Sequence, residues 1–180
     1  MSRWMSVAAA AVVFAGACAS APDTEEEQAS LEARAESTKA EMIARDPGLQ
    51  TLLNRASGYV VFPSIGKGGV IVGGAAGTGV VYERGQVIGY AELNQGSIGA
   101  QLGGQTFGEL MVFGDPNTWQ RFLLGEEFST GGNVSAVAVN KGAAAGANFR
   151  SGVGVFVMPK GGLMLDISVA GQTLKFIPAR

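Results

Sequence analysis

The chain has 180 residues, a formal charge of −2 and 28 glycines, and it contains no histidine and one cysteine. These counts exclude Ser-His-Asp and Cys-His catalytic sites, zinc sites built on histidine and cysteine, and an internal disulfide bond. Nucleic-acid-binding proteins present a strongly basic face, whereas this chain is close to neutral, so we expect no nucleic-acid partner.

The first 17 residues have the organisation of a secretory signal peptide. Arg3 is followed by the apolar run Val7–Ala17, which is too short to span a membrane. The only cysteine, Cys18, comes directly after Ala15-Gly16-Ala17, a sequence that resembles the bacterial lipobox although it has alanine where leucine is preferred. We predict a signal peptide over residues 1–17 and a lipid anchor on Cys18. The alternative is an ordinary signal cut nearby.

Two segments without β character follow the cysteine. Residues 18–28 are expected to form a flexible tether, and Ala19 favours anchoring on the periplasmic face of the outer membrane, since aspartate there would indicate retention in the inner membrane. Residues 29–56 are predicted to be helical, because good helix formers fill 29–45, Asp46-Pro47-Gly48 breaks the helix, and a second short helix covers 49–56. Residues 23–46 hold eight acidic and three basic residues, so we expect this helix to pack on the domain rather than dock on a membrane.

Residues 57–180 are predicted to form a glycine-rich β domain. Short β-type runs recur every 8–12 residues between glycine turns, which is typical of an antiparallel sandwich or barrel. Asp115-Pro116 is a helix start, with a helix expected over 117–124. The predicted class is therefore mainly β (α+β), an antiparallel β-sandwich or barrel-like domain with N-terminal helices and one short internal helix. The expected strands are 59–62, 70–72, 79–82, 86–94, 97–105, 106–113, 134–140, 152–158, 163–170 and 173–177.

Basic residues beside the glycine-rich segments are the candidate binding groups. Lys67 and Lys160 each adjoin such a segment, and Lys141 and Arg150 could join them around an anion such as a phospholipid headgroup, because glycine backbone N–H groups can hold an anion. The alternative is that all four are solvated turn residues. No phosphate-loop or dinucleotide motif is complete, so we expect no cofactor and no metal.

Several ordered stretches resemble the SYLF lipid-binding domain, over about residues 40–180. The resemblance implies a β-rich, non-catalytic domain that binds phospholipid, with phosphoinositides bound by eukaryotic members; lipid-anchored bacterial members are known as a group. Eukaryotic members are thought to use a basic amphipathic N-terminal helix on membranes, whereas the corresponding segment here is acidic. The matching stretches are GYVVFPSIGKGGVIVGGAAGTGVVYERG (58–85), SIGAQLGGQTFGELMVF (97–113), DPNTWQRFL (115–123), SAVAVNKGAAAG (135–146) and KGGLMLDISVAGQTLKFIP (160–178).

The expected function is that of a lipid-anchored envelope protein that binds phospholipid without catalysis. One alternative is an envelope scaffold that binds a protein partner through a sheet edge or the charged helix. Another is an enzyme with Asp/Glu chemistry, for which Glu109 and Asp166 are the pair to test because both interrupt apolar runs. Glu83 and Glu92 are the other acids in or beside the predicted strands.

Overall fold

A computed structural model describes residues 20–69, 72–98, 105–125, 128–130, 136–146, 152–161, 169 and 171–179. The predicted signal peptide, the predicted anchor Cys18 and the candidate residues Arg150 and Asp166 lie outside these ranges.

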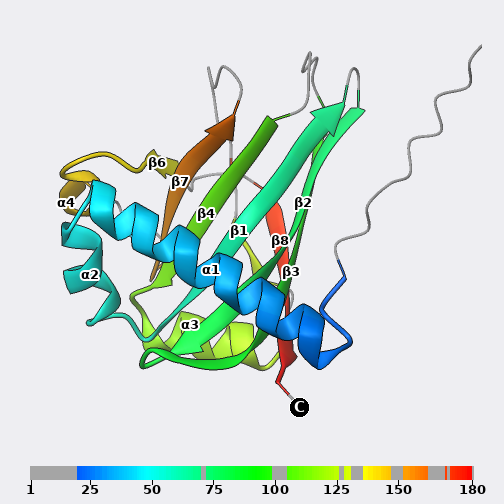
Figure 1. The fold of residues 1–180 in the computed structure, drawn as a ribbon, viewed down its shortest axis with the longest axis horizontal. Coiled ribbons are helices and arrows are strands. Elements are labelled where there is room, and N and C mark those ends of the chain that lie inside the picture. Colours follow the sequence, from blue (N-terminus) through cyan, green and yellow to red (C-terminus); the bar gives the residue numbers. More distant parts are fainter. Residues whose placement is uncertain are drawn as a thin grey trace, which may run out of the picture.

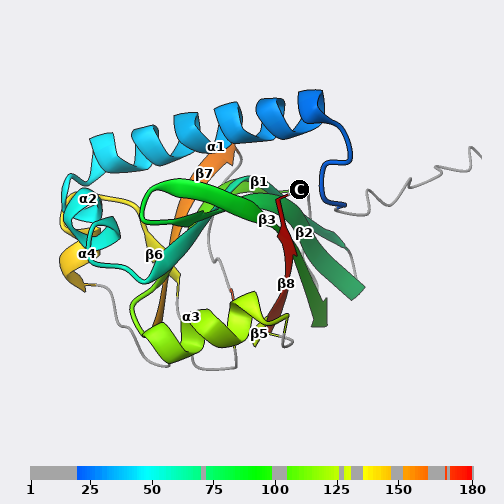
Figure 2. The same ribbon diagram turned by 90° about the horizontal axis from the view of Figure 1, so that it is seen from below.

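The described residues build one sheet of eight strands, curled into a half-barrel, with helices on both sides (Figures 1 and 2). The strand order is β5-β8-β3-β2-β1-β4-β7-β6, with every neighbouring pair antiparallel except β6 and β7. The predicted mainly β, barrel-like class with N-terminal helices and a short internal helix is confirmed. The elements are α1 Glu25–Arg45, α2 Gly48–Leu53, β1 Gly58–Gly69, β2 Val72–Glu83, β3 Gln86–Ile98, β4 Gln105–Phe113, α3 Pro116–Leu123, β5 Phe128–Ser129, β6 Ala136–Ala138, α4 Ala143–Gly146, β7 Val153–Gly161 and β8 Gln172–Pro178.

The strands β1 and β2 extend far beyond their predicted ranges. The first was expected to end at residue 62, before Pro63, but β1 continues to Gly69 with a register shift between Val61 and Ile65. A bulge is one of the few places where a strand tolerates proline, because the missing N–H is not needed for the ladder there. Residues 73–78, expected to separate two strands, lie within β2. Lys67 is therefore a strand residue and not a turn residue.

The convex side of the sheet is covered by α1, α2 and α4 (Figure 2). The first helix begins at Glu25, inside the predicted tether, because Thr24 and Glu27 form a capping box that satisfies backbone N–H groups at its start. One stripe of α1 is buried, formed by Leu31, Ala35, Thr38 and Met42. The helix approaches β4 closely at Gly108, where a Cβ would lie 2.9 Å from Thr38 Cγ2.

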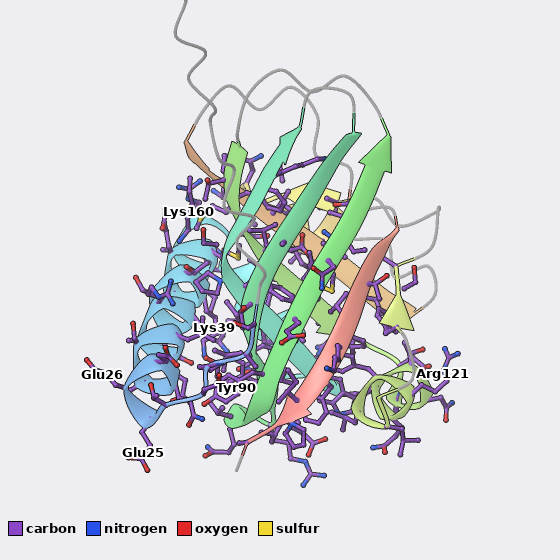
Figure 3. All side chains as sticks on the ribbon, turned by 90° about the vertical axis from the view of Figure 1, so that its right-hand side faces the viewer. Glu25, Glu26, Lys39, Tyr90, Arg121 and Lys160 are labelled. Carbon is purple, nitrogen blue, oxygen red and sulfur yellow. The ribbon has the colours of Figure 1, made fainter. Side chains whose placement is uncertain are left out.

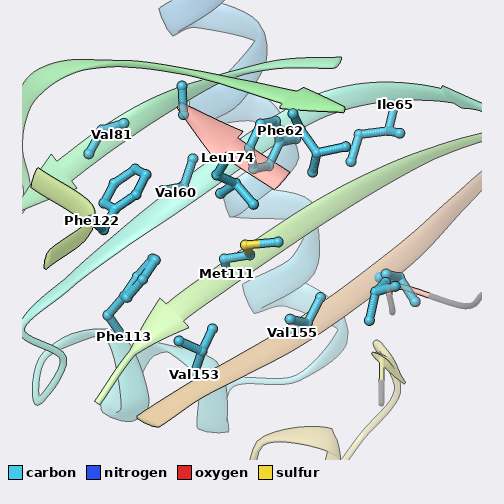
Figure 4. Packing of buried hydrophobic residues seen from close by; sticks show 14 of the residues in the cluster. Val60, Phe62, Ile65, Val81, Met111, Phe113, Phe122, Val153, Val155 and Leu174 are labelled. Carbon is cyan, nitrogen blue, oxygen red and sulfur yellow. The ribbon is translucent and has the colours of Figure 1, made fainter. Parts of the chain in front are cut away.

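The concave side encloses the larger apolar cluster (Figure 4) and is closed by α3. Asp115 caps α3 as predicted, since its carboxylate accepts hydrogen bonds from the Thr118 backbone N and hydroxyl at 2.8 and 2.7 Å. The α3 rings of Trp119 and Phe122 each lie with their centroids 5.1 Å from that of Phe113. The Trp119 ring occupies the space that a side chain at Gly58 would fill, which explains a glycine at the first residue of β1.

Candidate functional site

The structure places two of the predicted headgroup residues on opposite sides of the sheet. Lys67 is 4% exposed and faces the concave side, because its β2 partner Ala75 belongs to the core that the sheet encloses. Lys160 lies near the end of β7 and donates a 3.0 Å hydrogen bond to the hydroxyl of Thr38 in α1, on the convex side (Figure 3). These two lysines cannot contribute to one anion site.

The other predicted binding residues give no second cluster among the described residues. Lys141 is exposed in the turn that precedes α4. Arg150 and the predicted anchor Cys18 lie outside the described ranges.

Polar side chains gather on the concave side, where the surrounding residues are apolar. Lys67, Ala75, Gln95 and Gln172 are successive cross-strand partners on β1, β2, β3 and β8, so they face the same side of the sheet. The three polar members of this row are at most 6% exposed. Buried polar groups are informative because each needs a partner.

Glu109 joins this row from the far side of the half-barrel. Its Oε2 accepts a 3.0 Å hydrogen bond from Gln172 Nε2, and both side chains are fully buried. The bond crosses the concave side, since β3, β2 and β1 stand between β8 and β4 in the sheet. Thr130 Oγ1 fixes Gln172 by accepting a 3.0 Å hydrogen bond from its backbone N. The sequence singled out Glu109 but gave no signal for Gln172.

Burial determines the ionisation of Glu109. It raises the pKa of the carboxyl to about 8, with the Gln172 hydrogen bond acting weakly in the opposite direction. Burial therefore favours the neutral form of the Glu109 carboxyl group. Two other acids considered for catalysis have structural partners: Glu83 accepts from Trp119 Nε1 at 2.8 Å, and Glu92 accepts from the Ala21 backbone N at 2.9 Å. In the part of the chain that the structure describes, no three acids or cysteines group as metal ligands.

A basic cleft lies at the junction of α1, α2 and the β2–β3 turn, and sequence reasoning missed it. Its volume is about 470 Å³, and its polar lining comprises Lys39, Gln50, Asn54, Tyr59 and Arg84. None of its described lining residues is acidic, although the carboxylate of Glu36 pairs with Lys39 beside it. Three other cavities lined by described residues include acids, Asp23 or Glu92.

Lys39 is held in place by contacts around its ammonium group. Nζ lies 2.7 Å from Glu36 Oε1 and 4.7 Å from the centre of the Tyr82 ring. The Tyr82 ring stacks on Tyr59 with centroids 4.9 Å apart. A cation over an aromatic face is attracted by the ring quadrupole, so Lys39 reaches the cleft from a fixed position. Nothing in the sequence placed Tyr82 beneath Lys39.

Arg84 projects from a strained turn on the other wall. It has φ 51° and Gly85 has φ 80°, so both central residues of this two-residue hairpin lie in the left-handed region. Arginine is unfavourable there compared with asparagine or glycine, and such strain at a non-glycine residue is a reason to look for a function. Within the described residues the Arg84 guanidinium forms no ion pair.

No protein-family model and no curated protein matches this chain. Among the described residues, none of the helices combines the length and apolar character needed to cross a membrane.

Proposed function

We propose that the protein is a lipid-anchored component of a bacterial envelope that binds phospholipid without catalysis, and that the headgroup binds in the basic cleft. The observation that carries the proposal is that Lys39 and Arg84, 45 positions apart in the chain, line one cleft, where Lys39 is held by Glu36 and Arg84 has no ion-pair partner among the described residues. Phosphate oxygens favour lysine and arginine, which give charge-assisted hydrogen bonds. The carboxamides of Gln50 and Asn54 add donors for the remaining phosphate or glycerol oxygens.

The sequence supports a membrane context for this site. The resemblance to the SYLF domain implies phospholipid binding, and the lipobox-like sequence at Cys18 implies an anchor. Ser20, two residues after that cysteine in the sequence, contacts the sheet, because its carbonyl oxygen accepts a 3.1 Å hydrogen bond from the Thr78 hydroxyl on β2. Anchoring raises the local concentration of headgroups, so a weak cleft would still be occupied. We place the protein on the periplasmic face of the outer membrane.

The scaffold alternative has less support from the described residues. Both edges of the sheet are short strands, since β5 has two residues and β6 has three. Among large apolar side chains of the described residues, only Leu124 is exposed, so no apolar patch offers a protein partner a docking face. The charged outer face of α1 is the surface left for such a partner.

Vesicle co-flotation of a soluble chain covering residues 20–180 tests the proposal. We would compare neutral vesicles with phosphatidylglycerol and cardiolipin vesicles at two salt concentrations. The cleft variant is Lys39→Met with Arg84→Asn, which keeps the aliphatic packing of Lys39 and suits the left-handed turn. The control is Lys141→Met with Arg121→Gln, which removes the same charge from exposed sites elsewhere.

We expect salt-sensitive binding to anionic vesicles that falls at least about tenfold in the cleft variant and stays unchanged in the control, since a charge-assisted hydrogen bond contributes about 1.5 kcal/mol or more. Equal binding by both variants would exclude the cleft as the site. If no vesicle binds, membrane association would come from Cys18 alone and the scaffold alternative would lead.

A further inference from the structure

The side chains that join β4 to β8 carry two unsatisfied oxygen atoms. Oε1 of Glu109 and Oε1 of Gln172 are buried and accept no hydrogen bond within the described structure. The same two side chains already share the 3.0 Å bond from Gln172 Nε2 to Glu109 Oε2. A buried acceptor without a donor destabilises the fold, so two of them on one bonded pair need a common explanation.

A single proton satisfies both atoms. An ionised carboxylate offers only acceptors, and a carboxamide oxygen is also an acceptor, so the two Oε1 atoms cannot bond to each other while Glu109 is charged. A protonated Glu109 has an O–H donor on the oxygen that is not bonded to Gln172. The edges of a carboxylic acid and a primary amide are then complementary, and each group donates once and accepts once.

We propose that Glu109 is protonated in the folded protein and forms a pair of hydrogen bonds with Gln172, a proton-dependent clasp that holds β8 against β4 across the concave side. Loss of the proton removes one of the two bonds and leaves two acceptors facing each other. The clasp therefore loosens at alkaline pH, and β8 loosens with it.

The surroundings of Glu109 favour the neutral form. Its cross-strand neighbours are Phe62 on β1 and Val157 on β7, both fully or almost fully buried. The described charged groups on this side are Lys67 in β1 and Glu83, which is bonded to Trp119 of α3. Lys67, the cation of the two, forms no ion pair with Glu109. The pKa of Glu109 is raised by burial itself.

The clasp is independent of the basic cleft, because the cleft lies on the convex side between α1, α2 and the β2–β3 turn. The clasp concerns how the half-barrel is closed, and the proposal holds whether or not the protein binds lipid.

Carbon-13 NMR of the chain 20–180, labelled at the glutamate carboxyl carbon, tests the proposal directly. The Glu109 signal is identified by its absence in Glu109→Gln. We expect the chemical shift of the Glu109 carboxyl carbon to keep its protonated value through pH 7 and to change only at alkaline pH. A signal that titrates with the exposed glutamates would overturn the proposal, and this outcome is readable on the wild-type chain even if the variant folds poorly.

Amide hydrogen exchange in β8 provides the second readout. In Glu109→Gln, the new side chain forms the same two hydrogen bonds with Gln172 but cannot lose a proton. The free energy of opening of β8, obtained from exchange rates corrected for intrinsic exchange, should therefore become independent of pH. Wild type should open more above pH 8 than at pH 6. The control is Glu92→Gln, which changes an acid on the opposite face of β3 and should keep the wild-type pH dependence. Identical pH dependence in wild type and Glu109→Gln would contradict the clasp.

Discussion

The two sides of the curled sheet are stabilised by different kinds of contact. On the convex side, a single stripe of α1 packs on the sheet and polar groups surround it, including the 2.8 Å hydrogen bond from Tyr90 OH to Glu32 and the cation of Lys39 over Tyr82. On the concave side, the rings of Phe113, Trp119 and Phe122 pack on one another in a dry cluster. The convex side can adapt to a change because solvent is close. The concave side has little freedom to do so.

Truncation of a central ring should show this contrast most strongly. Phe113→Ala removes the ring that contacts Trp119, Phe122 and Phe128, so we expect it to lower the free energy of unfolding by about 4 kcal/mol in urea denaturation. Leu31→Ala under α1 is the matched change on the convex side, with an expected loss of about 2 kcal/mol. Equal losses would mean that both sides are packed alike.

The ionisation of Glu109 gives the concave side a pH dependence of its own. Its folded pKa of about 8 lies above the ordinary 4.5, so the unfolded chain releases the proton first as pH rises. Stability from this group is complete below pH 4.5 and is lost progressively up to about pH 8, at roughly 1.4 kcal/mol per pH unit. Between pH 5 and 7, the free energy of unfolding of wild type should fall by about 2 kcal/mol more than that of Glu109→Gln. Parallel stability curves would refute this.

The smallest expected effect concerns the helix on the convex side. Thr24→Ala removes the hydroxyl that accepts from the Glu27 backbone N at 3.2 Å, and loss of such a cap costs about 1 kcal/mol. Because α1 meets the sheet with one stripe only, we expect exchange protection to fall in the first turns of α1 and to stay unchanged in β4. Equal loss in both would show that helix and sheet unfold as one unit.

The sequence predicted those features that depend on neighbouring residues. The Asp115-Pro116 start of α3 and the end of α1 before Asp46 follow from local cap and breaker chemistry, and both are present. Pro63 was misjudged because the bulge that accommodates it depends on the pairing of β1 with two neighbours. Glycines at 73–78 were taken for a turn because a strand in the middle of a sheet is supported by its partners more than by its own propensity.

The candidate sites could not be predicted from neighbouring residues, because their side chains come from distant parts of the chain. Glu109 and Gln172 are 63 positions apart, and they meet only because the sheet curls. The basic cleft takes Lys39 from a helix and Arg84 from a hairpin turn, and no spacing in the chain records that meeting. Lys67 was noticed for its glycine neighbours, yet alternation along β1 turns it inward.

The place of β8 in the sheet has a consequence for the order in which the protein can form. β8 pairs with β3 from Gly89 opposite Pro178 to Gln95 opposite Gln172, although more than 70 residues separate the two strands. Whether the chain emerges at synthesis or on export, β1, β2 and β3 emerge together, and their hairpins need no later residue. The free edge of β3 remains unpaired until β8 emerges. Emerging chains should therefore hold an open half-barrel until β8 is present, and this is the interval in which a chaperone would have most to protect.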